Sequence, residues 1–326
     1  MTRPDYVFIV GSSRTGTSFL REILNSSEDV AICDETHFFE SPKTLTNLLW
    51  YLLNGPESAA NWGKTELMEK LTTPGVRHEL AQVGNMSSDS GVERIVDYLR
   101  SCWRWAPANI NREELLHRLL ASDRTERSLF DAVMACYANG KPIRGEKTPA
   151  HIYHVPTLLE WFPNAKIVHT FRDPRAIFAL QKGLPFSRKG FTRLYSILRH
   201  SALIFEIYLS LDIIITWLRI TQLHHQYQQL YPNNYYLFKY EDLLEIPQVH
   251  LKKLCDFLEI DLTERMLQRV SQDPSRGPSP RMQGVGGVDS WRKHLHPATD
   301  RWFVWVCKKH LLEFGYRLDK GAYRNG

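Results

Sequence analysis

The chain has 326 residues, of which 43% are hydrophobic and 24% charged, enough for one large α/β domain or two small ones. Its net charge of +5 suits an anionic ligand, but lysine and arginine form no block, which argues against nucleic-acid binding. The five cysteines are scattered without a Cys-x-x-Cys pair, which argues against a disulfide framework or a zinc site and favours a reducing compartment.

The first elements are a strand, a loop and a helix. Tyr6–Val10 is an apolar, β-rich run, and Gly11–Leu20 reads GSSRTGTSFL. Gly11 and Gly16 have the spacing of a nucleotide P-loop, but the lysine of that motif is absent and Arg14 lies within the loop. Glycines, hydroxyl groups and the start of a helix all present donors to an anion. The loop therefore predicts an anion site, although not one for the triphosphate of ATP or GTP.

The middle of the chain has a different character. After a weaker strand near Val30–Cys33, helical patterns dominate from Ser41 to Gly140 and are interrupted by turn signals such as Asn54–Pro56. We expect residues 1–326 to form a single domain that contains residues 41–140 as a helical insertion on the substrate side of the site. The alternative, that this stretch only completes the core, stays open.

The rest of the chain alternates short strands with helices. Strands are predicted at Lys166–Phe171 and Tyr235–Phe238, and more weakly at Ile143–Gly145. Helices are predicted after Ala150, after Pro174, through Leu194–Gln229, after Ile246 and after Pro297. This alternation predicts an α/β fold, a parallel sheet with helices on both faces. Ligands of such sheets bind beyond the carboxyl ends of the strands, where the Gly11–Ser18 loop lies.

We expect neither a leader nor a membrane anchor. The five residues before the first strand are too few and too polar for a leader. The most apolar run, 203–220, contains Glu206, Asp212 and Arg219, and so predicts a core helix rather than a membrane span. With the cysteine pattern, this predicts a cytoplasmic protein.

A second candidate for anion binding follows the strand at Lys166–Phe171. The strand runs into Arg172, and Pro174 is suited to the first turn of a helix. Arg172 would then share one edge of the sheet with the Gly11–Ser18 loop, which favours a ligand role. The alternative is an ion pair with Asp173.

Five segments, in this order along the chain, resemble those of sulfotransferases that use 3′-phosphoadenosine 5′-phosphosulfate (PAPS). They are Gly11–Leu20, Gly145–Pro149 (GEKTP), Lys166–Ile177 (KIVHTFRDPRAI), Lys239–Leu243 (KYEDL) and Ser290–Leu295 (SWRKHL). The resemblance covers Tyr6 to about Leu295 except the helical middle. It is closer to the bacterial and Golgi-type branches than to the cytosolic phenol sulfotransferases, which carry a lysine in place of Arg14. It implies the P-loop nucleoside-kinase-like fold.

The resemblance also implies which residues bind PAPS. The 5′-phosphate and the sulfuryl group would be held by Arg14, Thr15, Gly16, Thr17 and Ser18. The 3′-phosphate would be held by Arg172, and further candidate contacts around the long loop at 271–290 are Arg281, Trp291 and Arg292. The family usually adds a serine eight residues after the arginine, where this chain has Leu180. The missing serine could be replaced as a 3′-phosphate ligand by Arg175, Lys182, Ser187 or Arg188. Without such a replacement, the affinity for the 3′-phosphate is weak.

The acceptor base is expected in Cys33–Phe39, which reads CDETHFF and resembles the family segment that supplies it. Glu35 fits the base, and we expect burial among Phe38 and Phe39 to raise its pKa. His37 is the competing base, because imidazole titrates near neutrality.

Positive charge for the transferring group is expected from Lys147 and Arg14. By resemblance, Lys147 steadies the departing bridging oxygen or the sulfuryl group, and Glu146 positions Lys147 or binds substrate. A sulfuryl group carries less negative charge than a phosphoryl group, so the in-line transfer requires no metal. No carboxylate cluster or H-E-x-x-H pair occurs, and no metal site is predicted.

The predicted function is transfer of the sulfuryl group of PAPS to a hydroxyl or amine of a small organic or carbohydrate acceptor. A P-loop kinase or NTPase is the first alternative, and it requires the lysine that is missing after Gly16. A nucleotide-binding protein without catalysis is the second. The sequence specifies neither the acceptor nor the oligomeric state.

Overall fold

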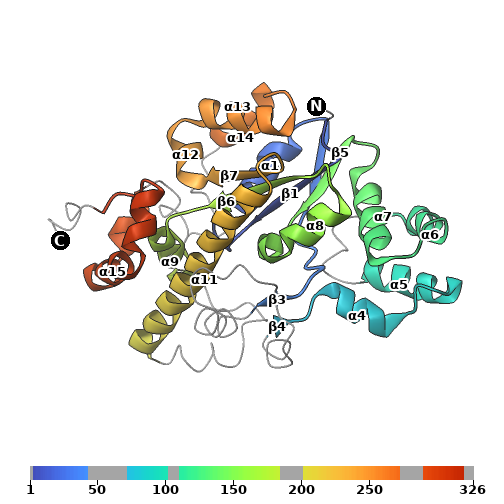
Figure 1. Ribbon diagram of the computed structural model, residues 1–326, viewed down its shortest axis with the longest axis horizontal. Helices are drawn as coiled ribbons and strands as arrows, with labels where there is room; N and C mark the ends of the chain where they lie inside the picture. Colours follow the sequence, from blue (N-terminus) through green and yellow to red (C-terminus); the bar gives the residue numbers. More distant parts are fainter. Residues whose placement is uncertain (1–2, 43–71, 102–109, 184–200, 272–288, 319–326) are drawn as a thin grey trace.

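The centre of the molecule is a parallel sheet (Figure 1). A computed structural model describes residues 3–42, 72–101, 110–183, 201–271 and 289–318. Across the sheet the strands are β2 (Val30–Cys33), β5 (Ile143–Lys147), β1 (Tyr6–Gly11), β6 (Lys166–Phe171) and β7 (Tyr235–Lys239). All five were predicted from the sequence, and their carboxyl ends share one edge of the sheet.

Both faces of this sheet are covered by helices, as predicted. Side chains of β1 alternate between two apolar clusters: Tyr6 and Phe8 belong to one, Val7 and Ile9 to the other. The second cluster is closed by α1 (Thr17–Asn25), α13 (Pro247–Leu258) and α14 (Glu264–Ser271). The first is closed by α7 (Glu126–Ala138), α8 (Val155–Trp161), α9 (Pro174–Lys182), α11 (Ala202–Leu230) and α15 (Pro297–Glu313).

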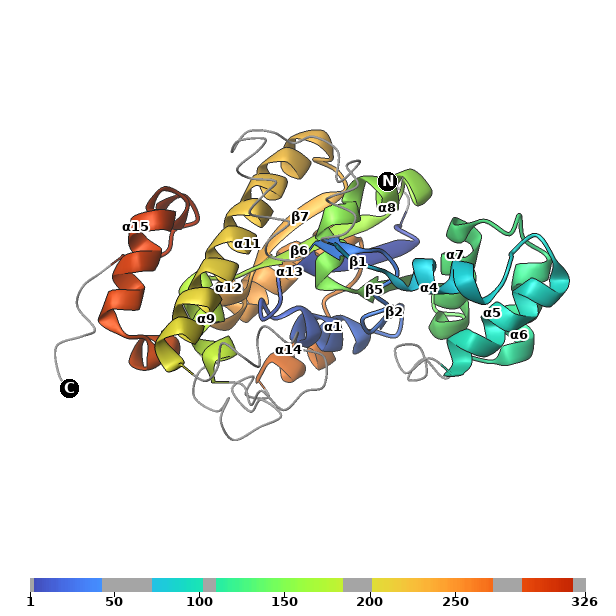
Figure 2. The ribbon, with the colours of Figure 1, turned by 90° about the horizontal axis from the view of Figure 1, so that it is seen from below.

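The described parts of residues 41–140 are mainly helical. They contain α4 (Val76–Val83), α5 (Asp89–Ser101), α6 (Arg112–Leu120) and the two short strands β3 (Ser41–Pro42) and β4 (Thr72–Thr73). Figure 2 shows α5, α6 and α7 gathered at one end of the molecule. Val92 of α5 and Leu115 of α6 are fully buried in the same cluster as Phe8. These helices therefore share the main core, and their role as a substrate cap stays a prediction.

Helix α11 extends past the edge of the sheet that carries the strand ends. It connects β6 to the parallel strand β7, so it runs back from the carboxyl edge toward the amino edge. The indole Nε1 of Trp217, in the middle of the helix, donates to the carbonyl of Arg172 directly after β6, at 3.0 Å. Residues Ala202 to Thr216 therefore lie beyond that edge, over roughly 20 Å of helix.

Among the described residues, no helix is both long enough and apolar enough to cross a membrane. Even α11, with 29 residues, contains no window apolar enough to cross a bilayer among the residues placed. Three short elements complete the description: η2 (Pro149–His154), α12 (Tyr240–Glu245) and η4 (Ser290–His294).

Candidate active site

The loop between β1 and α1 has the backbone shape that its glycines predict. Gly11 has a φ of 147° and Gly16 one of 89°, and Arg14 also has a positive φ of 70°. The Thr15 hydroxyl donates to the Ser12 carbonyl at 2.8 Å and lies 2.7 Å from the hydroxyl of Thr170 in β6. The Thr15 side chain thus fastens the loop to the neighbouring strand.

The residues on either side of Thr15 differ in exposure. Thr17 is buried at the first position of α1, whereas Ser18 is exposed and Arg14 is partly exposed. The first N–H groups of a helix have no acceptor within the helix. The start of α1, which follows β1 directly, therefore brings backbone N–H groups to the carboxyl edge of the sheet, with Arg14 and Ser18 in the same segment.

Lys147, the last residue of β5, lies between two carboxylates. Its Nζ is 2.6 Å from Glu35 Oε1 and 2.6 Å from Asp34 Oδ1, and the side chain is 2% exposed. The other carboxylate oxygen of Glu35 lies 3.1 Å from Nε2 of His37. The structure thus brings together Glu35, His37 and Lys147, which come from two loop ends far apart in the sequence.

The pKa of Glu35 corrects one expectation. Partial burial raises it, but the hydrogen bond from His37 and the charge of Lys147 outweigh burial, and the pKa falls from 4.5 to about 2. The expected raising by Phe38 and Phe39 fails because both rings point into the core. They pack against Phe130 with ring centroids 5.2 and 6.5 Å away. In this structure Glu35 is an ion-paired carboxylate.

Glu146 forms a separate network on the other face of β5. Successive residues of a strand point to opposite faces, so Glu146 faces away from its neighbour Lys147. Its carboxylate contacts the Thr36 hydroxyl and Nδ1 of His151, and accepts from the Thr148 hydroxyl at 3.0 Å. Glu146 is 1% exposed, which excludes a surface pair with Lys147.

This network holds the loop that carries Glu35 and His37. The backbone N–H of Thr36 donates to the Thr148 hydroxyl at 3.1 Å, and that of Phe39 donates to Nε2 of His151 at 3.3 Å. Because His37 has a positive φ of 49°, the loop adopts a conformation that an unbraced chain rarely populates. Glu146 therefore positions the loop rather than Lys147.

Arg172 lies directly after β6, on the same edge as the first loop. Its Nη1 donates to the Arg14 carbonyl at 3.3 Å, and its Cζ lies 4.2 Å from the centre of the Tyr240 ring. Its Nε is buried and has no hydrogen-bond partner within the described part of the chain. The alternative pair with Asp173 is not formed, because Asp173 binds Arg175 at 2.7 Å.

Tyr240 and Glu241 contribute to this site, although no role was predicted for them. They follow β7, which lies beside β6, so their place depends on strand order. Glu241 accepts from the backbone N–H of Asp173 at 3.0 Å and from the Tyr316 hydroxyl at 3.3 Å. Full burial raises its pKa from 4.5 to about 7, against the opposing charge of Arg172. The strand predicted at Tyr235–Phe238 was the feature of the sequence from which Tyr240 and Glu241 could have been placed at the carboxyl edge of the sheet.

Leu180 and its candidate substitutes lie mostly in packed surroundings. Leu180 is 6% exposed in the core. Arg175 is completely buried and binds Asp173, Asp300 (3.2 Å) and the Arg317 carbonyl (2.8 Å). Lys182 pairs with Glu206 at 2.5 Å. Ser187 and Arg188 lie outside the described residues, as does Arg281.

Trp291 and Arg292 lie close to Arg175. The Trp291 ring is 1% exposed and lies between two guanidinium groups, with Cζ of Arg175 at 4.9 Å and Cζ of Arg292 at 4.8 Å from its centre. Arg292 also binds Asp289 at 2.8 Å. Both residues line a small cavity together with Glu241. A cofactor contact for either one stays a prediction.

The described residues at this edge form no evident metal site, and one sizeable cavity lies elsewhere. Within the residues placed, no three of the His, Cys, Asp and Glu side chains are grouped to hold a metal ion. A cavity of about 580 Å³ lies at the amino ends of the strands, lined by Tyr6, Asp131 and Arg144 among others. It is on the opposite edge from Lys147 and Arg172, and we assign the site by the convergence of charged side chains.

Comparisons with known proteins identify the family of the chain. A family model described as "Sulfotransferase family" matches residues 4–264. The omega-hydroxy-beta-dihydromenaquinone-9 sulfotransferase of Mycobacterium bovis is 27% identical over 150 residues, which are 45% of this chain. The match spans only 36% of that relative's length.

Two solved structures are among those similar to this chain, and the first, with a TM-score above 0.5, supports the fold. The sulfotransferase domain from the Synechococcus PCC 7002 olefin synthase has a TM-score of 0.51 and 18% identity, covering 98% of each chain. A mouse sulfotransferase complexed with PAP, adenosine 3′,5′-bisphosphate, has a TM-score of 0.44 and 12% identity, covering 95% of this chain and 84% of that one.

Proposed function

Because the chain belongs to the sulfotransferase family, we propose that it transfers the sulfuryl group of PAPS to a hydroxyl or amine of a small organic or carbohydrate acceptor. One observation carries this proposal, the order of charged groups along the sheet edge. Lys147 and Glu35 lie at the end of β5, the loop with Arg14 at the end of β1, and Arg172 at the end of β6. This order suits an acceptor, a sulfuryl group and a 3′-phosphate.

The described residues fit the two anionic ends of PAPS. The buried Nε of Arg172, which has no partner in the described parts of the chain, is a donor available to the 3′-phosphate. Backbone N–H groups at the start of α1, together with Arg14, Thr17 and Ser18, suit the 5′-phosphate and the sulfuryl group. Thr15 and Gly16 shape this loop. Arg281, Trp291 and Arg292 remain proposed contacts.

Glu35 is the proposed base and His37 the second candidate. A carboxylate with a pKa of about 2 is a weak base while Lys147 neutralises it. Once Lys147 turns to the bridging oxygen or the sulfuryl group, Glu35 loses a cation and becomes a stronger proton acceptor. The same movement brings positive charge to the place where negative charge develops, which is the larger catalytic contribution.

We favour a hydroxyl over an amine as the acceptor group. The relative from Mycobacterium bovis is named for an omega-hydroxy compound, which supports an alcohol acceptor here.

Calorimetry with adenosine 3′,5′-bisphosphate and, separately, with ATP–Mg²⁺ tests which nucleotide the chain binds. We expect the bisphosphate to bind tightly; tight binding of ATP–Mg²⁺ alone would favour the kinase or NTPase alternative.

Replacing Lys147 tests the assignment of catalytic charge. We expect Lys147→Ala to lower kcat by roughly 10²–10³-fold, because it removes a cation aimed at the transferring group. Binding of adenosine 3′,5′-bisphosphate, measured by calorimetry, is expected to change little, because a contact of Lys147 with the 5′-phosphate is made at the expense of its ion pair with Glu35. Lys252→Ala, at an exposed position of α13, is the control. Full activity of the Lys147 variant with an accepted substrate would refute the role.

A further inference from the structure

The outward face of α15 combines two tryptophans with cations. Trp302 and Trp305 are 37% and 75% exposed, and their rings stack with centroids 5.5 Å apart. The helix buries its opposite face through Phe303, Cys307 and Leu311. The remaining exposed members of the outward face are Arg301, Lys308, Lys309 and Leu312.

The positive charge of this face is not cancelled within the helix. Asp300 is buried against Arg175 at 3.2 Å, and so points inward. Glu313 lies 2.5 Å from Nε2 of His225 and 2.9 Å from Nδ1 of His310, at the last turn. The outward turns of α15 therefore present three cations beside two indoles.

A second apolar surface lies on the neighbouring helix α11. Leu203, Ile204, Ile207 and Leu211 are 71%, 51%, 51% and 40% exposed. The spacing of Ile204, Ile207 and Leu211 places them on one face of the helix. They belong to the turns that extend beyond the carboxyl edge of the sheet, as the contact of Trp217 with Arg172 shows.

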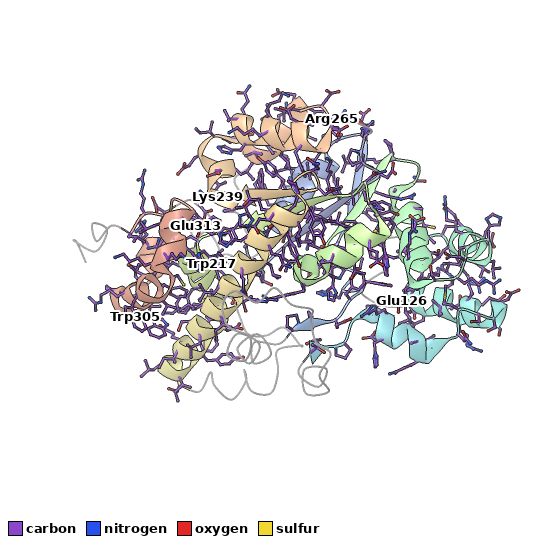
Figure 3. The ribbon with its side chains drawn as sticks, in the orientation of Figure 1. Glu126, Trp217, Lys239, Arg265, Trp305 and Glu313 are labelled. Carbon is purple, nitrogen blue, oxygen red and sulfur yellow. The ribbon has the colours of Figure 1, made fainter. Side chains whose placement is uncertain are left out.

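The two surfaces lie at the same end of the helix pair. Trp217 and His225, in the second half of α11, both contact His310 near the end of α15. Figures 1 and 2 both place the beginning of α15 beside the first turns of α11. In Figure 3, Trp305 lies at the outer margin of the molecule, away from Glu313 and Trp217.

We propose that the exposed faces of α11 (Leu203–Leu211) and α15 (Arg301–Leu312) form a docking surface for an anionic lipid bilayer. Tryptophan is suited to the boundary between headgroups and acyl chains, because its ring is apolar and its N–H is polar. Lysine and arginine beside it are attracted to anionic headgroups while their stems cover apolar surface. Leucine and isoleucine of α11 add the apolar area that would be withdrawn from water.

Charge favours a bilayer over a second copy of this chain. A two-fold interface brings the same patch of both subunits together, so Arg301, Lys308 and Lys309 would face their own copies. An anionic membrane instead supplies the opposite charge. Because α11 begins on the carboxyl side of the sheet, docking would also turn the edge with Lys147 and Arg172 toward the membrane side.

Flotation of the full chain with lipid vesicles tests the proposal. We expect binding to vesicles of equimolar phosphatidylcholine and phosphatidylglycerol to exceed binding to phosphatidylcholine alone by at least about tenfold, and to weaken as salt is raised. Trp305→Ala and the double variant Lys308→Glu/Lys309→Glu are each expected to reduce this binding by about tenfold or more.

Matched controls lie on the far side of the molecule. Arg265→Glu reverses a charge on α14, which Figure 3 labels at the top of the molecule, well away from Trp305, and Val249→Ala trims an exposed apolar side chain of α13. Both are expected to leave vesicle binding unchanged. Equal losses in the controls, or no binding of the wild-type chain to anionic vesicles, would overturn the proposal.

Two further readouts separate the alternatives. If sedimentation shows a dimer that Trp305→Ala dissociates, and no vesicle binding, a second copy covers the surface and the proposal fails. Calorimetry with adenosine 3′,5′-bisphosphate is expected to give the same affinity for Trp305→Ala as for the wild type. If the wild-type chain does not bind adenosine 3′,5′-bisphosphate, that result would count against the proposed function and not against the docking surface.

Discussion

Glu35 and Lys147 neutralise one another. The carboxylate and the ammonium group are 2.6 Å apart, and the lysine is almost completely buried. Such a pair holds the lysine in place and suppresses the basicity of Glu35. The proposed reaction would separate these same two groups.

Binding of nucleotide is expected to raise the pKa of Glu35. Adenosine 3′,5′-bisphosphate would draw Lys147 toward the 5′-phosphate, and a carboxylate that loses a cation binds its proton more tightly. The pKa should therefore move from about 2 toward the ordinary 4.5, measured by carbon-13 NMR of the side-chain carboxyl group over a pH series. In Lys147→Ala the value should already be raised, and nucleotide should change it little. An unchanged pKa in the wild type would contradict this view.

At the scale of elements, the sequence predicted what depends on local pattern. The apolar runs and Gly11, Gly16 and Pro174 predicted the strands, the loop and the start of α9. Placing the loop and Arg172 on one edge required only that the strands be parallel. The Ser41–Gly140 insertion was predicted as helical, and the described part contains four helices.

The rest of the site depends on contacts between distant elements. The low pKa of Glu35 comes from the hydrogen bond with His37 together with Lys147, which is 112 residues away, and so the expected raised pKa was wrong. The place of Tyr240 beside Arg172 follows from β7 pairing with β6. The helix predicted through Leu194–Gln229 was interpreted as a core helix, but its first described turns expose apolar side chains because they extend beyond the sheet.

The loop between β1 and α1 is expected to be intolerant of a side chain at Gly16. A Cβ there would lie 2.3 Å from Cδ2 of Tyr240, at a φ of 89° that L-residues rarely adopt. Gly16→Ala should therefore displace the Tyr240 ring from Arg172 and weaken binding of adenosine 3′,5′-bisphosphate by roughly tenfold or more, measured by calorimetry.

Gly140→Ala is the matched control for this prediction. Gly140 has a similar φ of 85°, but a Cβ there would meet nothing within 4 Å. Its substitution should cost about 1 kcal/mol of stability through backbone strain alone, and leave nucleotide affinity unchanged. Equal affinities for the two variants would show that Tyr240 does not support the nucleotide site.

For the whole molecule, buried Glu241 links stability to pH. Its pKa is about 7 in the folded chain, so between pH 4.5 and about 7 the folded state holds one more proton than the unfolded state. The contribution of Glu241 to the free energy of unfolding should fall across this range by roughly 3 kcal/mol as pH rises, since each pKa unit corresponds to 1.36 kcal/mol. Urea denaturation over a pH series should show this decline in the wild type relative to Glu241→Gln, which lacks it. Glu245→Gln, at an exposed position of the same helix, should retain it.

The order of groups along the sheet edge also has a kinetic consequence. Lys147 and Glu35 lie on the β5 side of the central loop, and Arg172 and Tyr240 on the β6 side. The two substrates can therefore occupy the molecule at the same time and meet over the loop, without a sulfated enzyme intermediate. Initial rates measured against both concentrations should give intersecting reciprocal lines; parallel lines would mean that the first product leaves before the acceptor arrives.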